Sequence, residues 1–194
     1  MEPLEEKDIR ACFVTVKSEA KRINLPRPLS GVPWADLDFL GWRDPGAPDR
    51  GYIVADQDGR LTGVTLRAAQ GIHRSFIKIT ACMLCITAHP GTGVRLLTAP
   101  RAGAAGRHAN TVGTYMCADL ACSLYLRGKK TTGLGMRYEQ SLPLQAKIDR
   151  TRLNLASSLN RILALGACAG TARRVCTPSW PAAFVGVLAS GWRG

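Results

Sequence analysis

Long hydrophobic runs are missing from this sequence of 194 residues. The longest apolar stretch, PAAFVGVLAS at 181–190, is too short to span a bilayer. No apolar run follows the acidic N-terminus MEPLEEKDIR, so this end resembles neither a signal peptide nor a transit peptide. We therefore expect a monomeric cytoplasmic protein that makes no contact with membranes.

Acidic residues are scarce in the second part of the chain. Of the 14 Asp and Glu residues, 11 lie at or before Asp58, whereas 18 of the 26 Lys and Arg residues lie after it. Residues 1–58 therefore carry a net charge of −3 and residues 59–194 a net charge of +15. Because summed charge steers association, this excess predicts an acidic partner, either RNA phosphates or an acidic protein surface. The alternative is a role in solubility alone.

Groups suited to acid–base catalysis are also few. Only His73, His89 and His108 have side chains that titrate near neutral pH, and none lies in a nucleophile motif. Asp36 and Asp38, in WADLDFLGW, form a candidate carboxylate pair, but alternating acidic residues among aromatics are more typical of turn caps. We therefore expect a protein that is not an enzyme.

The length and composition fit one globular domain. The sequence is 46% hydrophobic and 21% charged, which is close to the average of folded domains. We predict a single domain over residues 1–165 and a poorly ordered tail over residues 166–194, where hydrophobic periodicity is lost. Cys168 and Cys176 lie in this tail and have no companion pair. Removal of the tail is expected to leave stability nearly unchanged.

Hydrophobic spacing predicts an α+β fold, with a small antiparallel sheet and flanking helices. Apolar residues at three- and four-residue steps predict a helix over 5–23, and Asp58-Gly59 marks a hairpin between strands at 52–55 and 61–67. We interpret 33–51 as an ordered loop held by its aromatics and 99–113 as a basic, glycine-rich loop. Further strands are predicted at 74–81, 93–99 and 112–117.

Two more helices are expected near the C-terminal side of the domain. One begins at 117–119 and ends at Gly128, a residue that readily adopts a left-handed cap. The other runs from Ser141 to about Leu165, with Pro143 in its first turn. Its predicted buried face consists of Leu144, Ile148, Leu155, Leu159 and Ile162.

Four of the seven cysteines form two close pairs. Cys82 and Cys85 are separated by two residues between predicted strands, whereas Cys117 and Cys122 span the end of a strand and the start of a helix. A two-residue spacer in a tight turn brings two thiolates onto one ion, and a helix N-terminus favours thiolates. The two pairs together predict one structural Zn²⁺. Four thiolates close the coordination sphere, so the metal stabilises the fold and does not act as a catalyst.

Other interpretations of these residues stay open at this point. The cysteines of an isolated pair are often ordinary buried thiols, and a redox pair needs a thioredoxin-like strand–helix–strand that this region lacks. His89 is an alternative fourth ligand, although such a histidine is more often an exposed loop residue. Cys12 lies on the buried face of the first predicted helix, where a thiol in the core is expected.

A hairpin with one cysteine pair, a long connection and a helix with the second pair is the arrangement of a treble-clef zinc finger, here spanning about residues 75–130. At this level of detail EAKRINLP, PWADLDFLGWRDPGAPDRGY, CMLC and VGTYMCADLACSLYLRGKK resemble actinobacterial members of the FusB-type elongation factor G-binding family. The resemblance covers roughly Met1 to Leu165. Its most specific parts are the two cysteine pairs with the flanking GTY and RGKK.

The resemblance implies a treble-clef domain that binds elongation factor G and promotes its release from the ribosome, as in fusidic acid resistance. Direct binding of ribosomal or other RNA is the alternative that the positive charge supports. Aromatic and basic groups around the second cysteine pair suit either partner. These candidate partner-binding residues are Tyr115, Tyr125, Arg127, Lys129 and Lys130.

Overall fold

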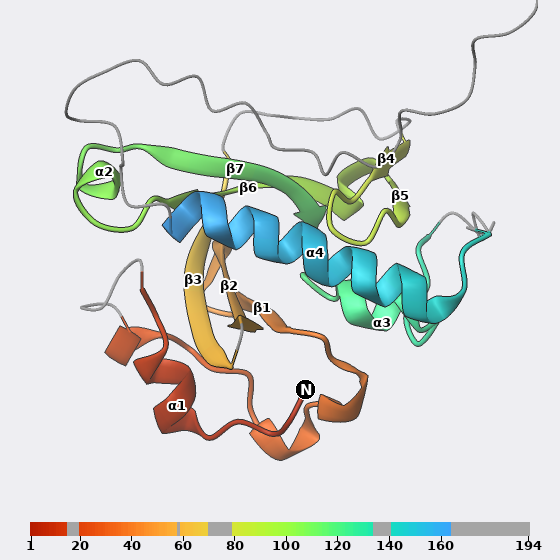
Figure 1. Cartoon of the computed structure of the whole chain (residues 1–194), viewed down its shortest axis with the longest axis horizontal. Helices are drawn as coiled ribbons and strands as arrows, with labels where there is room; N and C mark the ends of the chain where they lie inside the picture. The colour runs from red at the N-terminus through yellow and green to blue at the C-terminus, as the bar shows by residue number, and fades with distance from the viewer. Residues whose placement is uncertain (15–19, 58, 70–78, 134–140, 164–194) are drawn as a thin grey trace, which may run out of the picture.

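The structure is a computed structural model that describes residues 1–14, 20–57, 59–69, 79–133 and 141–163 (Figure 1). The predicted tail over 166–194, with Cys168 and Cys176, lies outside these residues, as does most of the strand predicted at 74–81. The described chain combines an antiparallel sheet with helices and a buried group of four cysteines, which confirms the α+β fold class.

One five-stranded antiparallel sheet forms the framework, with strand order β1-β2-β3-β6-β7. Two residue pairs, Arg67 with Thr98 and Ala68 with Leu97, join β3 to β6, so the two halves of the sheet meet over a short ladder. The strands are β1 (Leu40–Asp44), β2 (Ala47–Gln57), β3 (Arg60–Ala68), β6 (Val94–Pro100) and β7 (Thr111–Cys117).

The predicted hairpin between β2 and β3 is confirmed. Gln57 pairs with Arg60, so the turn between the strands has two residues. Gly59 has φ of 80°, a left-handed conformation that glycine adopts without the steric penalty of a Cβ atom. Its N–H donates to Asp56 Oδ1 at 2.8 Å, and this contact fixes the turn.

The loop predicted over 33–51 is wrong in part, because it contains β1 and the start of β2. Short 3₁₀ turns at Leu29–Gly31 and Trp34–Asp36 precede β1, which then pairs with β2 from Leu40 to Asp44. Glycine, proline and aspartate disfavour an isolated strand. A neighbouring strand that satisfies the backbone hydrogen bonds outweighs this local preference.

The first predicted helix is also shorter than expected. Helix α1 spans Glu6–Ala11, and a 3₁₀ turn follows at Ala20–Arg22. After α1 the backbone turns to the sheet, where Val14 N–H donates to the carbonyl of Gly63 at 3.0 Å and Gly63 N–H donates to that of Cys12 at 2.9 Å. These bonds to β3 replace the hydrogen bonds of a continued helix.

Each face of the sheet supports its own hydrophobic core, because side chains alternate along the strands. Tyr52 and Val54 face α1 and the N-terminal segment, whereas Ile53 faces the other side. The second core also holds residues of helix α4 (Leu144–Leu163) and all four predicted metal ligands: Leu155, Leu159, Ile162, Cys82, Cys85, Cys117 and Cys122.

Helix α4, Leu144–Leu163, crosses the sheet and ends beside β6 and α2 (Figure 1). Its buried face holds Ile148, Leu155, Leu159 and Ile162, as predicted. Leu144 was assigned to that face wrongly, since it is 46% exposed at the first turn. The structure adds two small polar residues to the face, Thr151 and Ser158.

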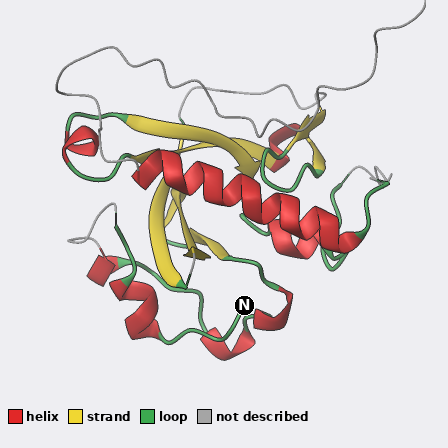
Figure 2. Ribbon diagram, in the orientation of Figure 1, coloured by secondary structure: helices red, strands yellow, loops and turns green. Residues whose placement is uncertain are grey.

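Three further short elements surround the cysteine pairs at one end of the molecule, whereas α2 (Ala104–Arg107), within the predicted basic loop, lies at the opposite end (Figure 1 and Figure 2). Strands β4 and β5 form a separate hairpin, so residues 79–81, the described part of the strand predicted at 74–81, pair with β5 and not with the strand predicted at 93–99. None of the helices in the described part of the chain has the length and apolar character needed to cross a bilayer. The three elements around the cysteine pairs are β4 (Ile79–Ala81), β5 (Ala88–Pro90) and α3 (Cys122–Leu126).

Candidate metal centre

The structure brings the two cysteine pairs to one point. Cys82 and Cys85 lie in the turn between β4 and β5, Cys117 is the last residue of β7, and Cys122 is the first residue of α3. The four Sγ atoms lie within 4.8 Å of one another, and all four residues have no exposed surface. Cys85 and Cys117 are 32 positions apart in sequence, and Cys82 and Cys122 are 40 positions apart. The fold therefore brings distant cysteines into a single buried group.

The spacing of the sulfurs fits zinc. Zn–S bonds near 2.3 Å in a tetrahedron place the sulfurs about 3.8 Å apart. Here Cys82 Sγ lies 3.8 Å from Cys122 Sγ, and Cys85 Sγ lies 3.5 Å from Cys117 Sγ. When bound, the metal would crosslink the β4–β5 hairpin, β7 and α3, and four thiolates leave no position for a reacting water.

A tight backbone turn forms each half of the site. In the first turn Ile86 N–H donates to the carbonyl of Cys82 at 2.9 Å, and in the second Leu120 N–H donates to that of Cys117 at 3.0 Å. Ile86 and Leu120 both have φ of 60°. This conformation is costly for a side chain, and most costly for a β-branched residue such as Ile86. A third bond, from Met83 N–H to the carbonyl of Tyr115 at 2.8 Å, ties the turns together.

The four buried thiols shift one another's pKa values, and the direction of the shift differs between them. Hydrogen bonds from Cys117 and Cys122 lower the pKa of Cys82, whereas the hydrogen bond with Cys117 and burial raise the pKa of Cys122. The neighbouring sulfurs and burial thus oppose ionisation of Cys122 in the absence of a metal. A divalent cation provides the positive charge that further thiolates need.

His89, on β5, lies directly beside the sulfurs. The expectation of an exposed loop histidine is wrong, because His89 is 3% exposed. Its Nε2 lies 3.3 Å from Cys117 Sγ, and its ring meets the Tyr125 ring edge-on at 4.7 Å and 88°. Burial lowers the pKa of His89, so its neutral form is favoured.

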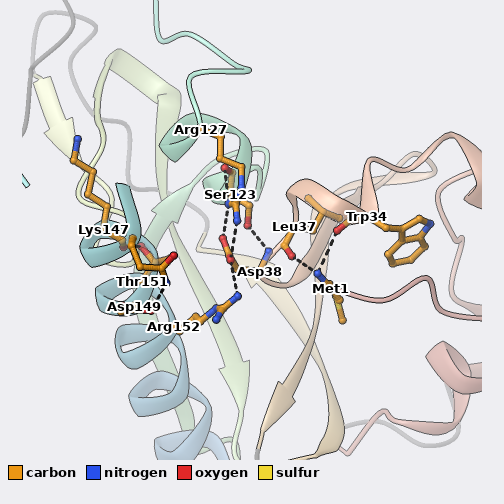
Figure 3. A network of polar contacts seen from close by, with 11 residues as sticks. Met1, Trp34, Leu37, Asp38, Ser123, Arg127, Lys147, Asp149, Thr151 and Arg152 are labelled. Carbon is orange, nitrogen blue, oxygen red and sulfur yellow. Dashed lines mark hydrogen bonds and ion pairs between the residues drawn. The ribbon is translucent and has the colours of Figure 1, made fainter. Parts of the chain in front are cut away.

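Arg127, predicted to contact a partner, makes its main contact within the chain. Its side chain is 15% exposed, and it donates to both oxygens of Asp38 at 2.7 and 3.1 Å. Arg152 of α4 reaches the same carboxylate at 3.1 Å, and Ser123 Oγ accepts from Asp38 N–H (Figure 3). Asp38 had been interpreted as a turn cap; it joins the N-terminal segment to α3 and α4.

The two lysines that follow are more exposed. Lys129 Nζ lies 2.6 Å from Asp36 with its side chain 56% exposed, and Lys130 Nζ lies 2.6 Å from Asp119 with its side chain 45% exposed. Both ion pairs are solvated, so each is worth at most about 1 kcal/mol and is easily exchanged for a contact with a partner.

The candidate tyrosines pack around the metal site. Tyr125 is half-buried and donates its hydroxyl to Asp119 Oδ2 at 2.9 Å, while Lys130 Nζ lies 5.7 Å from the centre of its ring. Tyr115 is half-buried against the core that contains the cysteines. All five candidate partner-binding residues are therefore near the second cysteine pair, and their contact with a partner stays a prediction.

Sequence reasoning missed the residues that hold α3 against the sheet. Leu120 lies over Gly41 and Gly51 of β1 and β2, and a Cβ atom at Gly41 would lie 2.7 Å from the Leu120 carbonyl oxygen. Glycine in a strand signals a close approach of another backbone, which was the available clue. The sequence near these glycines does not predict that Leu120 is the residue that approaches them.

Among solved structures, the chain is similar to the fusidic acid resistance protein FusC, with 16% identity and a TM-score of 0.41. The match covers 75% of this chain and 56% of that one, so the chain spans just over half the length of FusC. No curated protein sequence matches this chain. Residues 8–162, which include all four cysteines, match the FBP C-terminal treble-clef zinc-finger family, and the chain belongs to that family.

Proposed function

We propose that this protein binds elongation factor G and promotes its release from the ribosome. The observation that carries the proposal is membership in the treble-clef family over residues 8–162, combined with the sequence resemblance to elongation factor G-binding proteins. The buried group of four cysteines supports a binding protein, because four thiolates around one metal leave no open coordination position for catalysis.

The proposed metal is a single structural Zn²⁺ held by Cys82, Cys85, Cys117 and Cys122. A structural zinc contributes on the order of 10 kcal/mol of apparent binding free energy, because the assembled site exists only in the folded state. The site lies in the same core as α4, so the metal stabilises the packing of that helix as well as the finger.

The proposed contact surface lies after α3, at Lys129 and Lys130. These are the most exposed of the candidate partner-binding residues, and their solvated ion pairs can open toward an acidic surface. Arg127 supports this surface from beneath through Asp38, and Tyr125 supports it through Asp119. Elongation factor G is a plausible acidic partner for such a surface.

Isothermal titration with purified, nuclease-treated elongation factor G tests binding, and rapid-mixing kinetics at several salt concentrations measure the association rate. The double variant Lys129→Glu/Lys130→Glu should associate about tenfold more slowly and with a weaker salt dependence. The control is Arg60→Glu/Arg107→Glu, which makes the same change in net charge at two exposed residues on β3 and α2. Equal effects of the two double variants would contradict a contact at the end of α3.

Direct RNA binding is the second candidate, favoured by the net charge of +15 over residues 59–194. Phosphate contacts release counterions, so affinity for RNA should fall linearly with the logarithm of the salt concentration. Retention on ribosomal RNA with this salt slope, with no complex at tens of micromolar elongation factor G, would favour RNA over the protein partner.

A further inference from the structure

His89 brings a ring nitrogen to one of the four cysteine sulfurs. Its Nε2 lies 3.3 Å from Cys117 Sγ, within hydrogen-bonding distance for sulfur. The four sulfurs already supply the complete donor set of a closed tetrahedral site. We propose that His89 is a positioning residue that donates its Nε2–H to the Cys117 thiolate and slows loss of the metal without ligating it.

The surroundings hold the imidazole in this position. His89 pairs with Thr80 across the β4–β5 hairpin, which fixes its backbone. The Tyr125 ring closes one side edge-on at 4.7 Å. Gly93 closes another, since a Cβ atom there would lie 2.6 Å from His89 Cβ. Three separate segments therefore hold the His89 imidazole next to Cys117, so its side-chain conformation is restricted by packing.

A buried tetrathiolate site needs such a donor. Zn²⁺ with four thiolates carries a net charge of about −2, which is costly to bury unless N–H groups point at the sulfurs. Leu84 N–H lies 3.4 Å from Cys82 Sγ and serves one sulfur from the backbone. His89 serves Cys117 from a side chain. A thiolate accepts hydrogen bonds, so the imidazole must carry a proton on Nε2 in this contact.

The contact also connects the metal site to the surface. The Tyr125 hydroxyl donates to Asp119, and Lys130 pairs with the same carboxylate. Residues that hydrogen-bond to metal-ligating side chains orient those ligands and tune the metal. Their removal typically costs 10- to 100-fold in metal affinity. The expected role of His89 is of this size and concerns retention of zinc.

Transfer of zinc from the intact protein to a colorimetric chelator measures the effect. His89→Ala should still carry one zinc per chain but release it about tenfold faster, or more. Gly93→Ala, which displaces the imidazole without removing it, should also release zinc faster. His89→Gln retains an N–H donor and should restore part of the slow release. His108→Ala is the matched control, because His108 is exposed at the end of α2.

The visible spectrum of the Co²⁺-substituted wild-type protein is a second readout that needs no variant. It should show four sulfur ligands, because cobalt bands differ between four-sulfur and three-sulfur, one-nitrogen sites. A spectrum with one nitrogen ligand would overturn the proposal and make His89 a ligand. Unchanged release rates in both His89→Ala and Gly93→Ala would overturn it as well. If His89→Ala does not fold, Gly93→Ala and His89→Gln decide the outcome by the same rates.

Discussion

Arg127 and Asp38 are 89 positions apart in sequence and form a two-pronged ion pair with N–O distances of 2.7 and 3.1 Å. The Asp38 side chain is completely buried. Burial by itself would raise the pKa of Asp38, but the hydrogen bonds and charge of Arg127 outweigh it and hold the pKa below its usual value. This pair fastens the segment before β1 to the end of α3.

The first prediction concerns this ion pair. Arg127→Ala leaves the buried Asp38 carboxylate with the half-exposed Arg152 as its remaining positively charged partner among the described residues, and should lower the free energy of unfolding by about 3 kcal/mol. Arg152→Ala is the control and should cost less than about 1 kcal/mol, since its side chain is 57% exposed. Urea denaturation at fixed free zinc measures both variants.

The second prediction concerns the approach of Leu120 to the sheet. Gly41→Ala places a Cβ atom 2.7 Å from a backbone oxygen and should destabilise the protein by about 1–3 kcal/mol. Gly51→Ala meets the Leu120 side-chain end at 2.9 Å, which can shift, and should cost less. Gly31→Ala meets ordinary contacts at 3.5 Å and serves as the control. Equal melting temperatures for the Gly41 and Gly31 variants would contradict this account.

The third prediction concerns the metal. Purified protein should carry about one zinc per chain, and Cys82→Ser or Cys117→Ser should abolish binding and unfold the finger. Cys12→Ser is the matched control, because Cys12 lies outside the group of four and its Sγ donates to the Ile9 carbonyl, a bond that serine can keep. Metal analysis and circular dichroism measure the result. Full zinc content in Cys117→Ser would exclude the four-cysteine site.

The fourth prediction concerns alkaline pH. Burial and the hydrogen bond to Asp44 raise the pKa of Tyr52 to about 12. An unfolded tyrosine titrates near 10, so the folded protein holds this proton more tightly. The resulting stabilisation is complete below pH of about 10 and is lost as the pH rises to about 12. Tyr52→Phe should therefore lose less stability than the wild type between pH 9 and 11, and parallel losses would count against the shift.

The parts of the fold that depend on residues close together in sequence were predictable. The β2–β3 turn was predictable because Asp58-Gly59 suits a two-residue hairpin, and Gly59 has the left-handed conformation that the turn requires. The buried face of α4 followed from its helical spacing. The predicted burial of Leu144 was wrong, because hydrophobic periodicity identifies the buried face of a helix but not which end of the helix is exposed. Leu144 lies at the exposed end.

The meeting of the four cysteines was predictable from the sequence, but the residues that surround them were not. Two cysteines at short spacing can meet on one ion through local turns, so the spacing itself is informative. His89 was ambiguous, because its burial depends on Tyr125 and Gly93 lying against it. Periodicity also extended the first helix past Ala11, where the backbone instead bonds to Gly63, far along the chain.

The sequence by itself determined the turns, the periodic helix, the cysteine pairs and the split in charge, because each depends on residues within a few positions of one another. Only the tertiary structure decided that 40–44 is a strand, that Asp38 is buried between Arg127 and Arg152, and that Leu120 rests on Gly41. These features depend on backbone hydrogen bonds and desolvated charges contributed by distant segments. Such contacts outweigh local preferences of a few tenths of a kcal/mol to about 1 kcal/mol, and local sequence does not record them.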